Sequence, residues 1–250
     1  MEEELDSARV RVRHVSTCRL LPSCQYLQQR RNRMTQVTSA MREFWSVASI
    51  EQAMHERVVV PADPAVWNDA HQTEVMTDLL TGVTLQTGEI VLDYGCGVGR
   101  LTRSLLLRQA LVWAVDVSPV MLEYTRQYCF GLPGLTTILC DGFGCHSAPS
   151  ATAQGAVSCY CVQHMPSLEM VASVLRDIYR ILVPGGWFVL QSTDHGVDAT
   201  HGEVGFVGTR QRLTTLLNIS EQIGFTPVRV VYPLLPDGPP QYLITLSKHG

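Results

Sequence analysis

The sequence has 250 residues, of which 46% are hydrophobic and 17% charged, and its formal net charge is −4. This length is sufficient for one substantial core, and no apolar run reaches the roughly 18 residues that a membrane-spanning helix requires. Residues 1–40 hold seven arginines and four acids, which leaves 12 basic and 19 acidic residues in the remainder. With this acidic excess, the domain lacks the basic surface that nucleic-acid binding requires. We therefore expect neither a nucleic-acid nor a membrane partner.

The first 34 residues are rich in arginine and carry no regular apolar pattern. They lack the apolar segment of a secretory signal, and four of the first six residues are acidic, which transit peptides avoid. We therefore expect a cytoplasmic protein. Residues 1–34 should be an unordered extension, or a segment that does not belong to the native protein.

Residues 35–85 have the features of a helical cap. Apolar residues recur at near-helical spacing over 35–55, and a second helix is expected at 71–80. Pro61, Pro64 and the Asn68-Asp69 pair break any regular element between the two. We expect this cap to cover a pocket, with Trp67 as a candidate contact for an apolar ligand and Trp45 as a packing residue.

From residue 86 to 250 short apolar runs alternate with helical patterns. Strands are predicted at 89–94, 111–117, 136–141, 155–162, 186–193, 227–232 and 241–247, and helices at 98–107, 119–128, 167–182 and 209–223. This alternation predicts an α/β fold, a Rossmann-like doubly wound sheet of seven strands that is mostly parallel. Because the connection between the last two strands is too short for a crossover, the last strand should run antiparallel.

The turn after the first predicted strand reads Asp93-Tyr94-Gly95-Cys96-Gly97-Val98-Gly99. Glycine there permits unusual backbone angles and close approach of a ligand to the peptide groups. Arg100 stands after the third glycine, so the motif departs from the dinucleotide pattern, and Asp93 would repel a pyrophosphate. The turn therefore favours a cationic or zwitterionic ligand, the alternative being a tight turn without one.

Acidic residues also end the next two strands. Asp116 lies 21 residues after Gly95, near the spacing at which a carboxylate binds ribose hydroxyls, although it could instead cap the following helix. Asp141, with Gly142 and Phe143, offers a carboxylate beside an aromatic ring. The alternative is that these residues only form a turn.

Together, "VLDYGCGVGR", "VWAVDVSPVML", "LCDG", "CYCVQHMP" and "VLRDIYRILVPGGWFVLQ" resemble the class I S-adenosylmethionine-dependent methyltransferases, in particular the small-molecule "type 11" branch. The resemblance covers about residues 88–247. It implies that the chain is an enzyme that uses S-adenosyl-L-methionine and releases S-adenosyl-L-homocysteine.

The resemblance also assigns site residues. Asp93 and the backbone of Gly95 and Gly97 would hold the methionine end, Asp116 the ribose, and Asp141 the adenine amino group between Gly142 and Phe143. It implies that the remaining cofactor contacts are Cys96, Val117, Met121 and Tyr160.

For the acceptor, His164 is the candidate general base, because it follows the fourth strand and imidazole titrates near neutral pH. The alternative is that it fixes the loop before the next helix. The other polar candidates for the acceptor pocket are Gln163, Gln191 and Asp194, whereas His195 and His201 have the pattern of solvated loop residues.

Eight cysteines suggest a metal or thiol chemistry at first, but their spacings match no usual zinc motif, and most lie in apolar segments. We expect reduced thiols and no metal. The leading prediction is a methyltransferase with a small-molecule O or N acceptor. The alternatives are a protein or nucleic-acid acceptor, a thiol-assisted methyltransferase, a nicotinamide oxidoreductase and a non-catalytic binder of the same cofactor.

Overall fold

The computed structural model describes residues 22–47, 49, 75–194, 211–232 and 240–250. Its contacts divide the chain into two units, Met1–Gln36 and Val37–Gly250. The described part of the first unit is helical, and the second unit holds the sheet and all residues of the candidate site. The predictions for Trp67, His195 and His201 lie outside the described residues.

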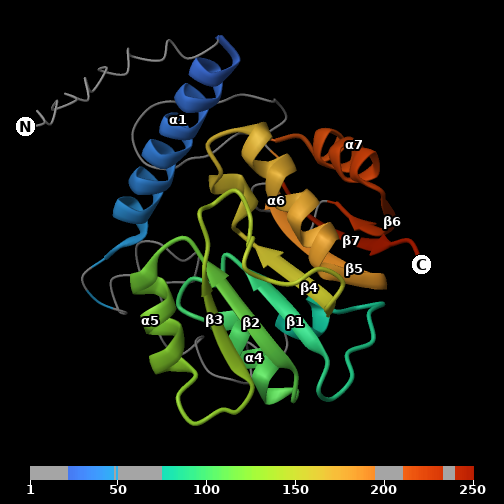
Figure 1. The fold of residues 1–250 in the computed structure, drawn as a ribbon. Coiled ribbons are helices and arrows are strands. Elements are labelled where there is room, and N and C mark those ends of the chain that lie inside the picture. The colour runs from blue at the N-terminus through green and yellow to red at the C-terminus, as the bar shows by residue number, and fades with distance from the viewer. Residues whose placement is uncertain (1–21, 48, 50–74, 195–210, 233–239) are drawn as a thin grey trace, which may run out of the picture. The chain divides into compact units, whose positions relative to one another are not determined.

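The second unit is built on one sheet of seven strands in the order β3-β2-β1-β4-β5-β7-β6 (Figure 1). Strands β1 to β5 pair in parallel, whereas β7 pairs antiparallel with both β5 and β6, which confirms the predicted sheet and its antiparallel last strand. The order reverses between β1 and β4, the position at which doubly wound sheets bind ligands. The strands are β1 Ile90–Tyr94, β2 Leu111–Asp116, β3 Leu135–Leu139, β4 Ala153–Cys159, β5 Leu182–Thr193, β6 Phe225–Val231 and β7 Gln241–Lys248.

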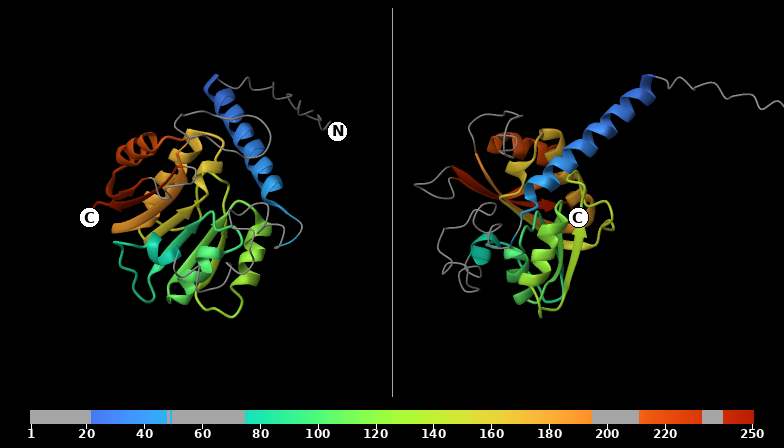
Figure 2. Two further views of the ribbon diagram at one scale, coloured as in Figure 1. Left: turned by 180° about the vertical axis from the view of Figure 1, so that it is seen from behind. Right: turned by 90° about the vertical axis from the view of Figure 1, so that its left-hand side faces the viewer.

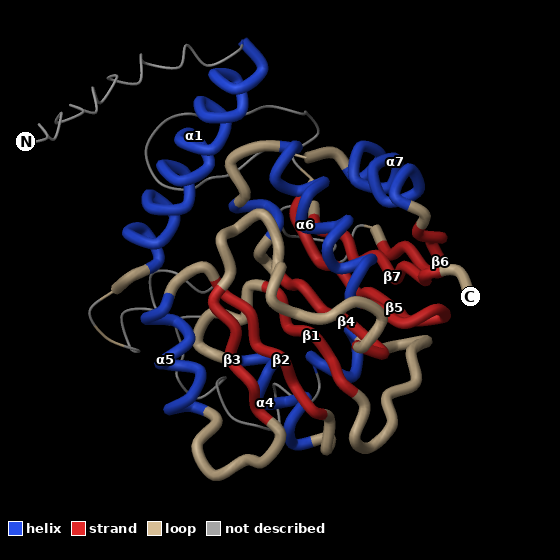
Figure 3. The backbone as a smooth tube through the Cα atoms, in the orientation of Figure 1, coloured by secondary structure: helices blue, strands red, loops and turns tan. Residues whose placement is uncertain are grey.

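Helices cover both faces of this sheet (Figures 1 and 2). Helices α4 and α5 pack on β1, β2 and β3, and α6 packs on α7 and β5, in front of the sheet in Figure 1. The alternation of helix and strand along the chain is visible in Figure 3. The helices are α1 Pro22–Trp45, α4 Arg100–Leu107, α5 Pro119–Tyr128, the 3-10 turn η3 Val162–His164, α6 Leu168–Ile181 and α7 Leu213–Ile223.

Local sequence signals explain where several helices begin and end. Ser118 and Ser167 accept hydrogen bonds from the backbone amides of Met121 and Met170, which caps α5 and α6. Gly224, with φ of +115°, ends α7 in the left-handed conformation typical of helix C-termini.

The core lies between the central strands and their helices. Val91, Val112, Val157 and Val189 of four neighbouring strands are fully buried in one cluster, together with Leu105 of α4. Because parallel strands are covered on both faces, their sequences read as continuous apolar runs, the pattern that predicted them.

The N-terminal part differs from the prediction. Helix α1 begins at Pro22, so residues 22–34 of the expected unordered extension are helical, and it ends at Trp45 instead of continuing to 55. The helix ends where Ser46 and Val47 form polar contacts with Ser118 and Tyr124 of the sheet domain. Of the predicted helix 71–80, the described part is helical over 75–79.

No helix within the described ranges is long and apolar enough to cross a membrane.

Candidate cofactor site

A pocket lies at the carboxyl ends of β1, β2 and β4, where the strand order reverses. It encloses about 970 Å³ of space, including its opening to solvent. Most of the residues predicted to bind the cofactor line it: Asp93, Gly95, Cys96, Gly97, Asp116, Val117, Met121, Gly142 and Tyr160. The structure adds residues that the predicted site did not include, namely Met41, Trp45, Tyr94, Val98, Arg100, Leu101, Cys140, Cys159, Cys161 and Met165.

The three glycines of the first turn have positive φ and different surroundings. A β-carbon on Gly95 would collide with the side chain of Cys161, and one on Gly99 would lie 2.9 Å from Thr125 Cγ2. A β-carbon on Gly97 would meet no atom within 4 Å. Gly95 and Gly99 are therefore required by packing within the protein, whereas Gly97 leaves open space in the pocket.

Asp93 is the next-to-last residue of β1, and its side chain is buried, with 2% of the residue exposed. Its Oδ2 accepts a hydrogen bond of 2.6 Å from Thr102 Oγ1 of α4. Burial raises the pKa of this carboxyl to about 6, while the Thr102 hydrogen bond and Arg100 act in the opposite direction. A cationic group bound in the pocket would favour the ionised form of Asp93.

Asp116 ends β2 and is 8% exposed. Its two oxygens accept hydrogen bonds from the backbone amides of Gly97, at 3.0 Å, and Ser118, at 2.9 Å. Burial raises its pKa to about 6, against the effect of these amides. The amide of Gly97 is thus bonded to Asp116 and that of Gly95 to the Val115 carbonyl, so the glycine turn and the end of β2 form one hydrogen-bonded unit.

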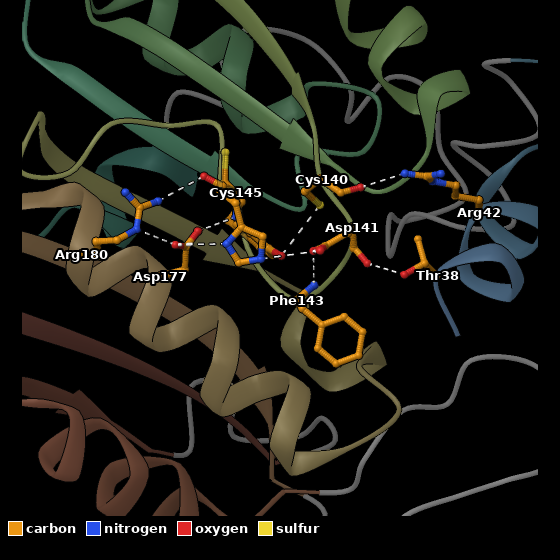
Figure 4. Close-up of polar contacts among 10 residues, drawn as sticks. Thr38, Arg42, Cys140, Asp141, Phe143, Cys145, Asp177 and Arg180 are labelled. Carbon is orange, nitrogen blue, oxygen red and sulfur yellow. Dashed lines mark hydrogen bonds and ion pairs between the residues drawn. The ribbon is translucent and has the colours of Figure 1, made fainter. Parts of the chain in front are cut away.

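The turn after β3 is held by polar contacts of its own residues (Figure 4). The side chain of Asp141 accepts from the Phe143 amide at 2.8 Å and lies 3.6 Å from His146 Nε2. Neither Asp141 nor Phe143 lines the pocket, whereas Gly142 does. The predicted contact between Asp141 and adenine stays a prediction, and what the structure shows for Asp141 is a role in holding the turn.

A polar network ties this turn to α6. Buried Asp177 accepts from the Cys145 amide and from Arg180 Nε (Figure 4). Arg180 also donates to the Ala148 carbonyl at 2.8 Å. His146 Nδ1 lies 3.7 Å from Asp177 Oδ1. An acidic residue on the buried face of a predicted helix was the only sequence signal for this network.

The end of β4 brings the acceptor candidates together. Tyr160 has φ of +54°, a strained value for this residue type, and its hydroxyl donates to Gln241 Oε1 at 3.1 Å. His164 lines the pocket with its ring edge-to-face to Trp45, at 5.3 Å between centroids.

The other acceptor candidates form polar contacts outside the pocket lining. Gln163 accepts from Thr193 Oγ1 at 3.0 Å and lies 3.4 Å from His164 Nε2. Gln191 Nε2 donates to Gln241 Oε1, and Asp194 pairs with Gln211 through the backbone as an isolated β-bridge. None of Gln163, Gln191 and Asp194 lines the pocket.

Four cysteines, Cys96, Cys140, Cys159 and Cys161, line the pocket. Burial raises the pKa of each thiol, to about 12 for Cys140 and Cys159. They are therefore neutral at physiological pH and form a polarizable wall without nucleophilic thiolates. Over the residues that the structure describes, no group of three His, Cys, Asp or Glu side chains is arranged to hold a metal ion.

Comparison with known proteins agrees with this geometry. Residues 91–186, which run from β1 into β5, match the family model described as a methyltransferase domain. Residues 91–186 therefore form a methyltransferase domain. Two solved methyltransferases of similar fold are described with bound S-adenosylhomocysteine.

Two curated relatives illustrate the range of the methyltransferase family. The chain is 32% identical over 127 residues to the demethylmenaquinone methyltransferase of Tropheryma whipplei (strain Twist), covering 51% of this chain and 50% of that one. It is 26% identical over 180 residues to the trans-aconitate 2-methyltransferase of Delftia acidovorans, covering 68% and 65%. The alignment thus spans about half to two thirds of the length of these relatives.

Solved structures of methyltransferases share the fold. An S-adenosylmethionine-dependent methyltransferase of Mesorhizobium loti superposes with a TM-score of 0.58 at 20% identity, covering 72% of this chain and all of that one. One from Leishmania major gives a TM-score of 0.67 at 14% identity, covering 84% and 82%. At these identities the likeness concerns the fold alone.

Proposed function

We propose that the protein transfers the methyl group of S-adenosylmethionine to an oxygen or nitrogen atom of a small-molecule acceptor in the cytoplasm. The observation that carries the proposal is that Asp93 and Asp116, buried at the ends of neighbouring strands, line one pocket with the open face of Gly97. The two carboxylates suit the amine and ribose hydroxyls of the cofactor, and the bare glycine leaves room for its amino-acid end.

The residues around the pocket fit such a cofactor. When bound, S-adenosylmethionine supplies a methyl group on a positively charged sulfur, which is already an electrophile. The protein therefore has to orient the acceptor, exclude water and accept a proton. Trp45, Met165 and Cys161 give the pocket an apolar, water-excluding surface beyond the two carboxylates.

His164 is the pocket-lining histidine among the described residues and suits the role of general base. Its ring is held by Trp45 and by the amide of Gln163, which Thr193 orients in turn. Such a support keeps an imidazole in one orientation toward an acceptor hydroxyl or amine. The names of the curated relatives, demethylmenaquinone and trans-aconitate methyltransferases, favour a small-molecule acceptor for this chain too.

The proposal is tested by label transfer with the full chain. Cofactor carrying a tritiated methyl group is incubated with separate small-molecule, protein and nucleic-acid fractions of a cell extract. We expect label in the small-molecule fraction, and His164→Ala should lower the transfer rate at least about 100-fold while leaving the affinity for S-adenosylhomocysteine unchanged.

Calorimetry with S-adenosylhomocysteine provides the control for this experiment. No binding by the wild-type chain would refute the methyltransferase assignment. Binding with label only in the protein or nucleic-acid fraction would instead refute the small-molecule acceptor, and binding without any transfer would indicate a non-catalytic binder. An unchanged rate in His164→Ala would leave His164 with a structural role.

A further inference from the structure

One face of α1 contacts the strand ends around the pocket. Met41 and Arg42 lie three and four residues after Thr38, and Trp45 lies three residues after Arg42, so the four share a face of the helix. Thr38 and Met41 are buried, and Met41 and Trp45 line the pocket. The described end of α1 is therefore part of the pocket wall.

Arg42 joins the ends of two strands. Its Nε donates to the Val117 carbonyl at 3.1 Å and its Nη2 to the Cys140 carbonyl at 3.2 Å. Because Asp116 pairs with Leu139 in the register of β2 and β3, these carbonyls lie just beyond the last paired residues. The planar guanidinium can bind both at once, which the ammonium group of lysine does less well.

Thr38 makes a second contact one turn earlier in the helix. Its hydroxyl donates to the backbone carbonyl of Asp141 at 2.6 Å (Figure 4). Residues 117, 140 and 141 are thus fixed to α1 by side-chain hydrogen bonds from Thr38 and Arg42.

Met41 lies against the turn that was expected to receive adenine. A β-carbon on Gly142 would lie 3.3 Å from Met41 Sδ, so the missing side chain of Gly142 allows this approach. Both residues line the pocket, whereas Asp141 and Phe143 do not. A methionine thioether makes favourable contacts with aromatic rings.

We infer that this face of α1 is part of the cofactor site: Met41 contacts the adenine ring, and Arg42 positions the ends of β2 and β3 around it. The inference rests on the proposed function, because it requires that the pocket binds S-adenosylmethionine. It assigns Asp141 to holding the turn through Phe143 and His146.

The ring contact is tested by NMR on the full chain labelled with methyl-¹³C-methionine. The Met41 signal is identified by its loss in Met41→Leu, a substitution that conserves volume. Saturation with S-adenosylhomocysteine should displace this signal through the ring current of adenine. Homocysteine, which lacks the purine, should not shift the Met41 signal. The signal of Met76, which is buried in the core cluster, should not shift with either ligand.

The positioning role is tested by calorimetry with S-adenosylhomocysteine on Arg42→Lys. We expect affinity to fall about tenfold, corresponding to loss of one charge-assisted hydrogen bond. Arg126→Lys, in an exposed pair with Glu123 on α5, is the matched control and should bind within twofold of wild type.

The outcomes separate this inference from the proposed function. Absence of S-adenosylhomocysteine binding by the wild type would refute the proposed function, and with it the inference. If S-adenosylhomocysteine binds but the NMR signal of the Met41 methyl group does not shift, the ring contact alone is refuted. If Arg42→Lys binds S-adenosylhomocysteine with wild-type affinity, the positioning role is refuted.

Discussion

Asp93 and Asp116 are carboxylates that burial has made costly to ionise. The pKa of each is raised to about 6. For an acid whose pKa is higher in the folded than in the unfolded chain, stability is greatest at low pH and falls as pH rises through the folded pKa. At neutral pH both residues therefore destabilise the fold, and binding of a ligand that needs the charges is a reason to keep them.

Asp93→Asn should consequently stabilise the fold and abolish function. The amide oxygen can still accept from Thr102, and the penalty of burying a charge disappears. A shift of about two pKa units corresponds to on the order of 3 kcal/mol at most, so we expect Tm to rise by about 5 °C at pH 8. Because the wild-type carboxyl is protonated in both states below about pH 4, the gain should vanish there.

Scanning calorimetry at pH 8 and pH 4 measures this effect. At pH 8 Asp93→Asn should also bind S-adenosylhomocysteine at least about tenfold more weakly, through loss of a charged hydrogen bond. Glu123→Gln is the control: hydrogen bonds from Gln127 and Arg126 lower the pKa of this exposed carboxyl, so its removal should give no stabilisation. A lower Tm for Asp93→Asn at pH 8 would contradict the argument.

At the scale of elements, the turn from β1 to α4 shows what a glycine motif means physically. Its pattern indicated a ligand-binding turn, but it could not separate glycines required by packing from those required by a ligand. The neighbours come from distant segments: Cys161 follows β4 and packs on Gly95, and Thr125 of α5 packs on Gly99. Gly97 is the member of the triplet left open toward the pocket.

Gly99→Ala should therefore destabilise the fold more than Gly82→Ala. Both glycines have similar φ, +90° and +83°, so the backbone strain is matched at about 1 to 2 kcal/mol. At Gly82 the added carbon meets nothing within 4 Å, whereas at Gly99 it lies 3.1 Å from the Thr125 backbone. We expect an additional loss of about 1 to 3 kcal/mol in Gly99→Ala, measured by urea unfolding. Equal losses in the two variants would show that the Thr125 contact is relieved without cost.

At the scale of the whole molecule, sheet order decides which strand ends meet. β1 lies between β2 and β4, so the segments that follow these three strands surround one pocket. The parallel strands were predictable because most of them are largely apolar runs. The extension of β5 back to Leu182 was not, because Pro184, Gly185 and Gly186 are typical of a turn. They lie in an irregular stretch between two pairs with β4, Leu182 with Ala153 and Trp187 with Gly155.

The pocket as a whole should discriminate between nucleotide cofactors. S-Adenosylhomocysteine present at 100 times its Kd stabilises the folded state by about 2.7 kcal/mol, which should raise Tm by roughly 5 to 10 °C. NAD, whose pyrophosphate would lie beside Asp93, should give no rise. Thermal unfolding with each ligand measures this difference, and a rise with NAD alone would favour the oxidoreductase alternative. Asp116→Ala serves as the negative control.

Periodicity along the chain predicted the seven-stranded sheet and its antiparallel last strand, because periodicity is a local property. The strand-end motifs indicated the cofactor through their resemblance to a known family. The sequence also identified the two carboxylates that line the pocket. The three-dimensional structure was needed to find that α1 contributes Met41 and Trp45, that Asp141 accepts from Phe143 and that cysteines form part of the pocket wall. These contacts join residues far apart in the chain, and such proximity depends on sheet order and helix packing, which no local pattern encodes.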